Sequence, residues 1–267
     1  MSKRSFTTAV KWLGSRWRLQ LFLYLGAYFA YSSTRWIAAG DVPKATAHAH
    51  WIENLERSLH VSVEGSVQQA LDTGVPIWVL NHLYLIAQFA VVPGALIFLY
   101  ARAPSVYRGL RNTLFATWLI AVPIYALFPV APPRLAGIGL VDTISTQTGF
   151  AMDSSLTTKF YNQLAAVPSL HVGFAVAVGI AVAAAVRNPF AKAVALLWGP
   201  TIGLAVVATG NHFVFDIAAG LVASAIGYAV GTAVTRLPSG RTGARVRPTT
   251  PARRPLRGFG DALAEAA

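Results

Sequence analysis

Long stretches of chain with almost no charged residue limit how this sequence can fold more than any other feature. Each is close to the roughly 20 residues that a helix needs to cross about 30 Å of hydrocarbon. They occupy residues 19–40, 74–101, 112–133, 168–186, 193–211 and 212–235. Only 12% of the residues are charged, whereas an ordinary soluble domain has about 25%. The sequence therefore predicts an all-α integral membrane protein with six transmembrane helices.

The basic residues set the orientation of these spans. With the N-terminus in the cytoplasm, most of the 22 Lys and Arg residues fall in cytoplasmic segments. The basic residues that fall outside are Arg35, Lys44, Arg57, Arg134 and Lys159. Such an excess of positive charge is typical of short cytoplasmic loops, so both termini are predicted to be cytoplasmic. The net charge of +12 would indicate a nucleic-acid partner if it were spread over a soluble domain. Because the basic residues lie mostly in the predicted cytoplasmic segments, nucleic acid is not a predicted partner.

An amphipathic segment is predicted at the outer face. In residues 44–72, apolar side chains recur at spacings near three and four, and the charged side chains fall mostly on other faces. The apolar set is Trp51, Ile52, Leu55, Leu59, Val63, Val67 and Leu71, and the polar set is Glu53, Glu56, Arg57, Glu64 and Gln68. This pattern favours one or two helices that lie in the membrane interface.

The remaining segments complete the domain organisation. Residues 131–167 form a second long outer loop, and loops of this length are often functional. We predict one membrane domain over residues 1–236, with its core at 112–235. Residues 237–267, rich in Arg and Pro at their start, are predicted to form a disordered basic cytoplasmic tail. The Ala- and Arg-rich composition favours a bacterial plasma membrane as the location.

Ionisable residues inside predicted spans are costly and therefore mark functional sites. His171 lies at the start of the fourth span, and His212 and Asp216 lie at the start of the sixth. The predicted topology puts all three at the outer face of the membrane. The chain has no cysteine, which excludes thiolate zinc sites, iron–sulfur clusters and cysteine nucleophiles.

The spacing of these residues indicates covalent chemistry on phosphorus. His212 and Asp216 are four residues apart, so one helix face brings them together. The carboxylate then orients one ring nitrogen of His212 and leaves the other as a nucleophile, while His171 protonates the leaving oxygen. Ser169 adds a hydroxyl at a helix N-terminus, which attracts anions, and the guanidinium of Arg134 binds phosphate.

Two further polar residues are candidate binding residues. Asn211 either caps the sixth span or contacts a phosphate oxygen. His82 lies near the outer end of the second span, where it either lines the pocket or packs at the interface. A structural polar pair remains the alternative interpretation of His212 with Asp216, and an interfacial contact with lipid phosphates remains the alternative for Arg134.

These motifs resemble those of the type 2 phosphatidic acid phosphatase superfamily, most of all its inositolphosphotransferase branch, which includes the inositol phosphorylceramide synthases. Pro168-Ser169-Leu170-His171 matches the signature Pro-Ser-Gly-His, with Leu170 in place of Gly. His212 and Asp216 match the His-x-x-x-Asp that ends the third signature. The proline-rich stretch that ends at Arg134 resembles the segment before the second signature. The resemblance implies a six-helix core, no metal or cofactor, and a histidine nucleophile paired with an aspartate.

The sequence also departs from the phosphatases of that superfamily. Their first signature, Lys-x6-Arg-Pro, is absent: with Arg134 at the arginine position, Leu127 and Leu135 stand where Lys and Pro are expected. Val206 stands where an arginine is expected before the nucleophile. These departures remove two phosphate-binding cations.

The predicted function is transfer of a phospho group from a lipid phosphate or phospholipid, through a phosphohistidine, to an alcohol such as inositol or to water. The partners are therefore a lipid substrate in the bilayer and a polyol acceptor. Two alternatives remain open. One is a metal-dependent membrane hydrolase that uses the two histidines and the aspartate as ligands. The other is a non-catalytic lipid transporter or scaffold in which these residues relay protons.

Overall fold

The computed structural model describes residues 41–152, 154 and 162–236, together with residues 21, 22, 24–26, 29 and 33. Within these residues the chain forms helices and no β-strand, which confirms the all-α class. The predicted tail of residues 237–267 lies outside the described residues, as does most of the predicted span of residues 19–40.

Four helices in the described part of the chain are long and apolar enough to cross a membrane. The first covers Val75–Arg102 and comprises α4 (Val75–Ile86), a π-helical turn (Ala87–Val91) and α5 (Val92–Arg102). The others are α6 (Pro104–Leu127), α10 (Pro189–Ala208) and the Val214–Val234 part of α11 (Val214–Arg236).

The predicted spans agree with these helices except at their ends. α6 begins at Pro104 rather than at residue 112, because a proline in the first turn has no N–H that would need a partner. It ends at Leu127 rather than at residue 133, just before a proline-rich stretch. The fourth predicted span corresponds to α9 (Leu170–Ala185), which is apolar but shorter than the other four. Six spans therefore stay a prediction.

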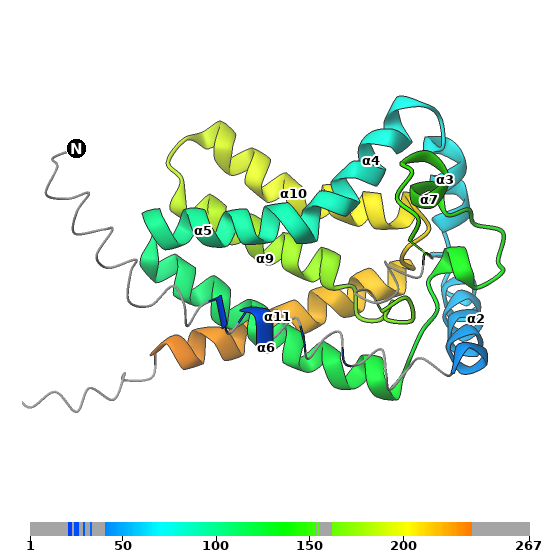
Figure 1. Ribbon diagram of the computed structural model, residues 1–267, viewed down its shortest axis with the longest axis horizontal. Helices are drawn as coiled ribbons and strands as arrows, with labels where there is room; N and C mark the ends of the chain where they lie inside the picture. Colours follow the sequence, from blue (N-terminus) through cyan, green and yellow to red (C-terminus); the bar gives the residue numbers. More distant parts are fainter. Residues whose placement is uncertain are drawn as a thin grey trace, which may run out of the picture. The chain divides into compact units, whose positions relative to one another are not determined.

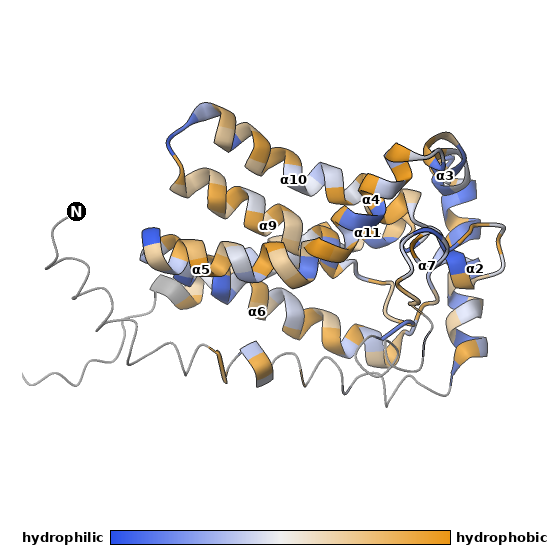
Figure 2. Cartoon of the chain, turned by 45° about the horizontal axis from the view of Figure 1, so that its top comes forward, coloured by the Kyte–Doolittle hydropathy of each residue, from blue (hydrophilic) through white to orange (hydrophobic). Residues whose placement is uncertain are grey.

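The long helices pack side by side. α11 packs along α6 and α9, and α9 packs against α10 (Figure 1). The shorter helices α2 (Val42–Ser58), α3 (Glu64–Leu71) and α7 (Thr143–Gln147) gather at one end of these helices. Figure 2 shows that the long helices are mostly hydrophobic, whereas hydrophilic residues concentrate in α2, α3 and α7. This distribution is typical of a bundle whose middle part lies in hydrocarbon.

The helices α2 and α3 bury a different face from the one that the sequence pattern predicts. Glu56, Glu64 and Gln68 are 2%, 3% and 6% exposed, whereas Trp51 and Leu59 are 53% and 61% exposed. The expectation that these polar residues avoid the packed side was wrong. The reason is that their side chains bond to backbone groups of other segments, so burial leaves those atoms with partners. The position of α2 and α3 in the membrane interface stays a prediction.

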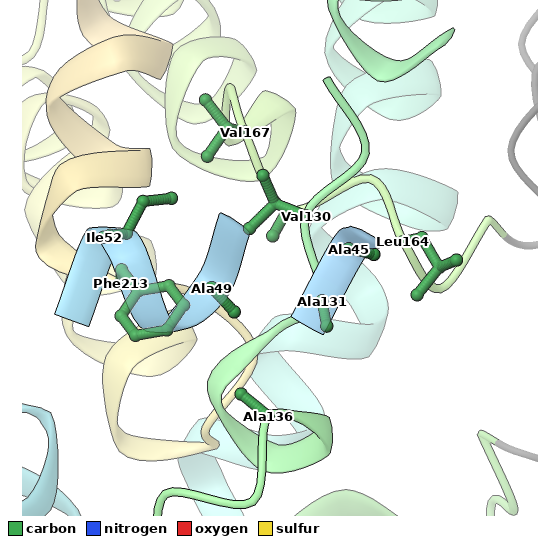
Figure 3. Packing of buried hydrophobic residues seen from close by; sticks show 10 residues of the cluster. Ala45, Ala49, Ile52, Val130, Ala131, Ala136, Leu164, Val167 and Phe213 are labelled. Atoms are coloured by element: carbon green, nitrogen blue, oxygen red, sulfur yellow. The ribbon is translucent and has the colours of Figure 1, made fainter. Parts of the chain in front are cut away.

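A cluster of small apolar residues joins α2 to the start of α11. Ala45, Ala49 and Ile52 of α2 are fully buried in one cluster with Phe213, and Ile52 and Ala49 lie nearest to its ring (Figure 3). The same cluster includes Val130, whose backbone pairs with Leu164 and Ala166 across the loop between α6 and α9. Alanine lets the backbones approach closely, so that α2 lies directly against the turn that carries His212.

Two glycines allow α9 and α11 to approach each other. A Cβ at Gly173 would lie 2.8 Å from the carbonyl oxygen of Gly220, and a Cβ at Gly220 would overlap the carbonyl of Ser169. Across the same contact, Ser224 Oγ donates to the Gly173 carbonyl at 2.9 Å. Small residues bring membrane helices into close contact in this way. The contact brings the two histidine-bearing segments to the same place.

Candidate active site

The segment that carries His212 is a tight turn between α10 and α11. The carbonyl of Val206 accepts the amides of both Asn211 and His212, at 3.0 and 3.1 Å. Gly210 has φ +68, a left-handed conformation that suits glycine. His212 was predicted to lie on the helix of residues 212–235. It lies instead in the turn, because α11 begins only at Val214.

His212 and Asp216 are in contact, as the sequence predicts. Nδ1 of His212 lies 3.2 Å from Oδ2 of Asp216, and the side chains are 4% and 0% exposed. The same oxygen accepts the amide of Phe213 at 2.9 Å. Asp216 therefore folds back over the first turn of α11 and reaches a histidine that precedes the helix. This pairing leaves Nε2 of His212 buried and without a hydrogen-bond partner among the described residues.

His171 lies beside His212. The two ring centroids are 5.8 Å apart, with the ring planes inclined by 56°. On its other side, the ring of His171 stacks on Tyr84 of α4, with centroids 4.3 Å apart and planes inclined by 19°. The structure thus brings together histidines that belong to two separate sequence motifs.

The start of α9 is tied directly to α11. The amide of Ser169 donates to the backbone carbonyl of Asp216 at 3.0 Å. Ser169 is fully buried and caps α9, since its side chain accepts from the amide of Val172 at 3.5 Å. Tyr125 of α6 donates its hydroxyl proton to the carbonyl of Pro168 at 2.7 Å. These bonds fix the segment that precedes His171.

Arg134 is held against the same turn. Its amide donates to the carbonyl of Gly210 at 2.9 Å, its Nε donates to Oδ1 of Asn211 at 3.0 Å, and its Nη1 lies 3.3 Å from Oδ2 of Asp142. The side chain is fully buried, and Nη2 has no hydrogen-bond partner in the described part of the chain. One arm of the guanidinium is thus available for an anion.

Of the two remaining candidate residues, Asn211 lies at the site and His82 lies apart from it. Asn211 is buried and has protein partners at both ends of its amide, because Nδ2 donates to Thr209 while Oδ1 accepts from Arg134. His82 is not brought into the group: its ring lies against Trp78, and its Nδ1 lies 2.7 Å from the Trp78 carbonyl. A direct phosphate contact by Asn211 or His82 stays a prediction.

Two residues near the site were not singled out from the sequence for the contacts that they make. Asp142 pairs with Arg134, and Gln68 bonds to the backbone of Val141 and to the carbonyl of Ala208, which ends α10. The one available signal was the scarcity of acidic residues, since the chain has only 10. Among so few, a carboxylate next to an apolar run is a candidate for a specific partner.

Three buried polar atoms of the site residues have no partner in the described part of the chain: Nε2 of His212, Oδ1 of Asp216 and Nη2 of Arg134. Within the described part of the chain, no group of three or more His, Cys, Asp or Glu side chains is arranged to hold a metal ion. A buried polar atom without a partner is costly. The arrangement therefore fits a polar ligand that supplies the missing bonds.

Comparison with known proteins identifies the family of this chain. The family model of the PAP2 superfamily matches residues 50–230, which span the two histidine segments, Asp216 and Arg134. No curated protein and no solved structure matches the chain. Because the family model covers more than half of the 267 residues, the chain belongs to the PAP2 superfamily of membrane lipid phosphatases and phosphotransferases.

Proposed function

We propose that this protein transfers a phospho group from a lipid phosphate or phospholipid, through a phosphohistidine on His212, to an alcohol such as inositol or to water. Membership of the PAP2 superfamily supports a phosphatase-type lipid enzyme. The observation that carries the finer proposal is the buried Nε2 of His212, which has no partner among the described residues although Nδ1 contacts Asp216.

The first half of the reaction forms a phosphorus–nitrogen bond. Nε2 of His212 attacks phosphorus while the bond from phosphorus to the leaving oxygen breaks. Asp216 accepts the Nδ1 proton of His212 in a hydrogen bond and stabilises the charge that the ring acquires. His171, in its protonated form beside His212, gives its proton to the leaving oxygen.

Arg134 contributes positive charge in this step. Its Nη2 bonds to a phosphate oxygen, while its Nε and Nη1 stay bonded to Asn211 and Asp142. Such a fixed guanidinium stabilises charge on the five-coordinate phosphorus without reorganisation. Asn211 thus acts as a positioning residue for Arg134. Ser169 and the amides at the start of α9 offer further donors to the same anion.

The second half of the reaction releases the phospho group. The hydroxyl of the acceptor gives its proton to His171, which is neutral after the first step, and its oxygen attacks phosphorus. The phosphorus–nitrogen bond breaks, and His212 regains its starting form. An alcohol acceptor gives a transferred head group, whereas water gives free phosphate or a phosphomonoester.

The excess of basic residues in the predicted cytoplasmic segments supports a site at the outer face of a bacterial plasma membrane. One membrane domain over residues 1–236 and a basic tail over residues 237–267 remain part of the proposal. The substrate then enters from the outer leaflet of the bilayer.

The test is to trap the intermediate. Purified protein in detergent is incubated with lipid phosphates carrying labelled phosphorus, with and without inositol, and is then denatured in alkali, which preserves phosphohistidine. Label on the peptide that contains His212, and its absence from the His212→Ala variant, supports the proposal. Normal turnover by the His212→Ala variant contradicts it, and loss of activity with a chelator favours the metal-dependent alternative.

The products distinguish transfer from hydrolysis. Labelled inositol phosphate product in the presence of inositol indicates transfer, and free phosphate in both conditions indicates hydrolysis. Vanadate, which mimics five-coordinate phosphorus, is expected to inhibit both reactions. A lipid transporter or scaffold shows neither product and retains its function after the His212→Ala substitution.

A further inference from the structure

We propose that Glu56 and Glu64 are positioning residues for His212: together they hold the amide end of α11 as a pair of carboxyl groups that shares one proton. The inference rests on the proposed function only in that it takes His212 as the nucleophile. The two glutamates come from α2 and α3, outside the membrane-spanning helices and outside the motifs that identify the site.

The hydrogen bonds define what the pair does. Oε1 of Glu56 accepts the amide of Phe215 at 2.6 Å, and Oε1 of Glu64 accepts the amide of Val214 at 2.8 Å. The amide of Phe213 is taken by Asp216. Three successive amides that follow His212 are thus bound by carboxyl groups from three helices. Amides at the start of a helix have no partner within it, so these contacts fix where α11 begins.

The surroundings of the pair require a proton. Glu56 and Glu64 are 2% and 3% exposed, and because they accept the amides of successive residues, their carboxyl groups lie close enough to interact. Two carboxylates are both acceptors, so a hydrogen bond between them needs a proton on one. Oε2 of Glu56 is buried and receives no hydrogen bond from a described donor, which makes it the atom that carries the proton.

The charged groups that face Glu56 act in the same direction. They are Glu64 on α3 and Asp216 on α11, and both disfavour a further negative charge. Burial, together with these neighbours, raises the pKa of Glu56 to about 8. Because this pKa lies above the ordinary value, the protonated form belongs to the folded state. The pair is then intact below about pH 8 and is lost as the pH rises above it.

The proton on Glu56 affects how an anionic substrate would bind beside His212. With Glu56 neutral, its carboxyl group adds no negative charge beside His212. Loss of the proton adds a negative charge next to a site that, in the proposed function, has to bind an anion. It also forces two buried carboxylates apart, which loosens the start of α11. Activity is therefore expected to fall on the alkaline side, as Glu56 loses its proton.

The Glu56→Gln substitution tests whether the neutral form of residue 56 is the active one. Glu56→Gln keeps an oxygen for the Phe215 amide and an N–H for Glu64, but it cannot titrate. Its kcat at pH 7 is expected within about twofold of the natural protein, and the alkaline decline near pH 8 is expected to disappear.

Glu56→Ala leaves the buried Phe215 amide without a partner and is expected to lower kcat about tenfold or more. Glu53→Gln, on the same helix but paired with Arg57, is the matched control and keeps the natural pH profile.

Two measurements do not need turnover. In the natural protein, the infrared band of a protonated carboxyl group is expected at pH 7 and should vanish above about pH 8. In Glu56→Gln this band should be absent. Hydrogen exchange of the amides at residues 213–215 is expected to accelerate in Glu56→Ala and to stay unchanged in Glu56→Gln.

The proposal is overturned if Glu56→Gln loses as much activity as Glu56→Ala, since an anion would then be needed. It is also overturned if the carboxyl band persists in Glu56→Gln, or if exchange at residues 213–215 is the same in all variants. Failure to trap phosphohistidine in the natural protein, with the band and the exchange pattern as expected, removes the proposed function and leaves the carboxyl pair in place.

Discussion

The starts of α9 and α11 each carry a histidine of the site, but their backbone amides are treated in opposite ways. At α9 the capping group is the neutral hydroxyl of Ser169. At α11 three carboxyl groups, from Asp216, Glu64 and Glu56, take successive amides. A helix N-terminus attracts anions. At α11, carboxyl groups of the protein already bind the amides that would otherwise attract one.

The difference assigns separate tasks to the two helix ends. The start of α11 holds the His212 turn with carboxyl groups, so in the proposed function the buried guanidinium of Arg134 has to supply the positive charge for a phosphate there. In the same proposal, the start of α9 offers its remaining amides to that phosphate. The following predictions test this division, from the largest expected effect to the smallest.

Removal of each histidine should have a different consequence. His212→Ala removes the attacking nitrogen and should lower kcat by roughly 10⁴-fold or more for every substrate. His171→Ala removes a proton donor and should cost about 10² to 10⁴-fold with a lipid leaving group, but far less with nitrophenolate, which leaves without a proton. The measurement is kcat with both substrate types. Equal losses for both leaving groups in His171→Ala would contradict the role of His171.

Arg134→Lys tests the cation that serves the acidic helix start. A lysine has one nitrogen and cannot bond to Asn211, Asp142 and a phosphate at the same time. Loss of one charge-assisted bond costs about 1.5–3 kcal/mol, so kcat/KM should fall about 10- to 100-fold. Arg57→Lys, at an exposed ion pair, is the control. Full activity in Arg134→Lys would show that the guanidinium does not contact the substrate.

Gly220→Ala tests the contact that brings the two helix starts together. The added methyl group would overlap the carbonyl of Ser169, so the protein should lose about 1–3 kcal/mol of stability, with a further loss of activity as His171 moves from His212. Gly203→Ala in α10 is the matched control, because a Cβ there has nothing within 4 Å. Thermal unfolding in detergent and kcat measure the two effects. Identical behaviour of both variants would contradict the close packing.

Tyr84→Leu tests the support of His171. The stacked pair contributes about 0.5–1.5 kcal/mol, so kcat should fall about two- to tenfold, and Tyr84→Phe should restore it. His82→Ala, on the same helix but in contact with Trp78, should change kcat by less than twofold. A larger loss in His82→Ala than in Tyr84→Leu would reverse this assignment and place His82 in the pocket.

Four apolar helices and the proximity of the two histidine motifs were predictable from the sequence. Apolar stretches long enough to cross hydrocarbon are local properties, and they locate four helices to within a few residues at most ends. The pairs Ser169–His171 and His212–Asp216 are short motifs, and the structure brings them together with ring centroids 5.8 Å apart. The ends of α6 were harder to predict, because proline acts on backbone bonds rather than on hydropathy.

The sequence by itself determined that the chain is helical and apolar and that His212 and Asp216 are in contact, since these properties reside in neighbouring residues. Only the tertiary structure decided that Glu56 and Glu64 are buried and that Asn211 holds Arg134. Glu56 accepts the amide of Phe215, which lies 159 positions further along the chain. Such a partnership depends on how α2 packs against α11, and periodicity on α2 alone places the same glutamate on a polar face.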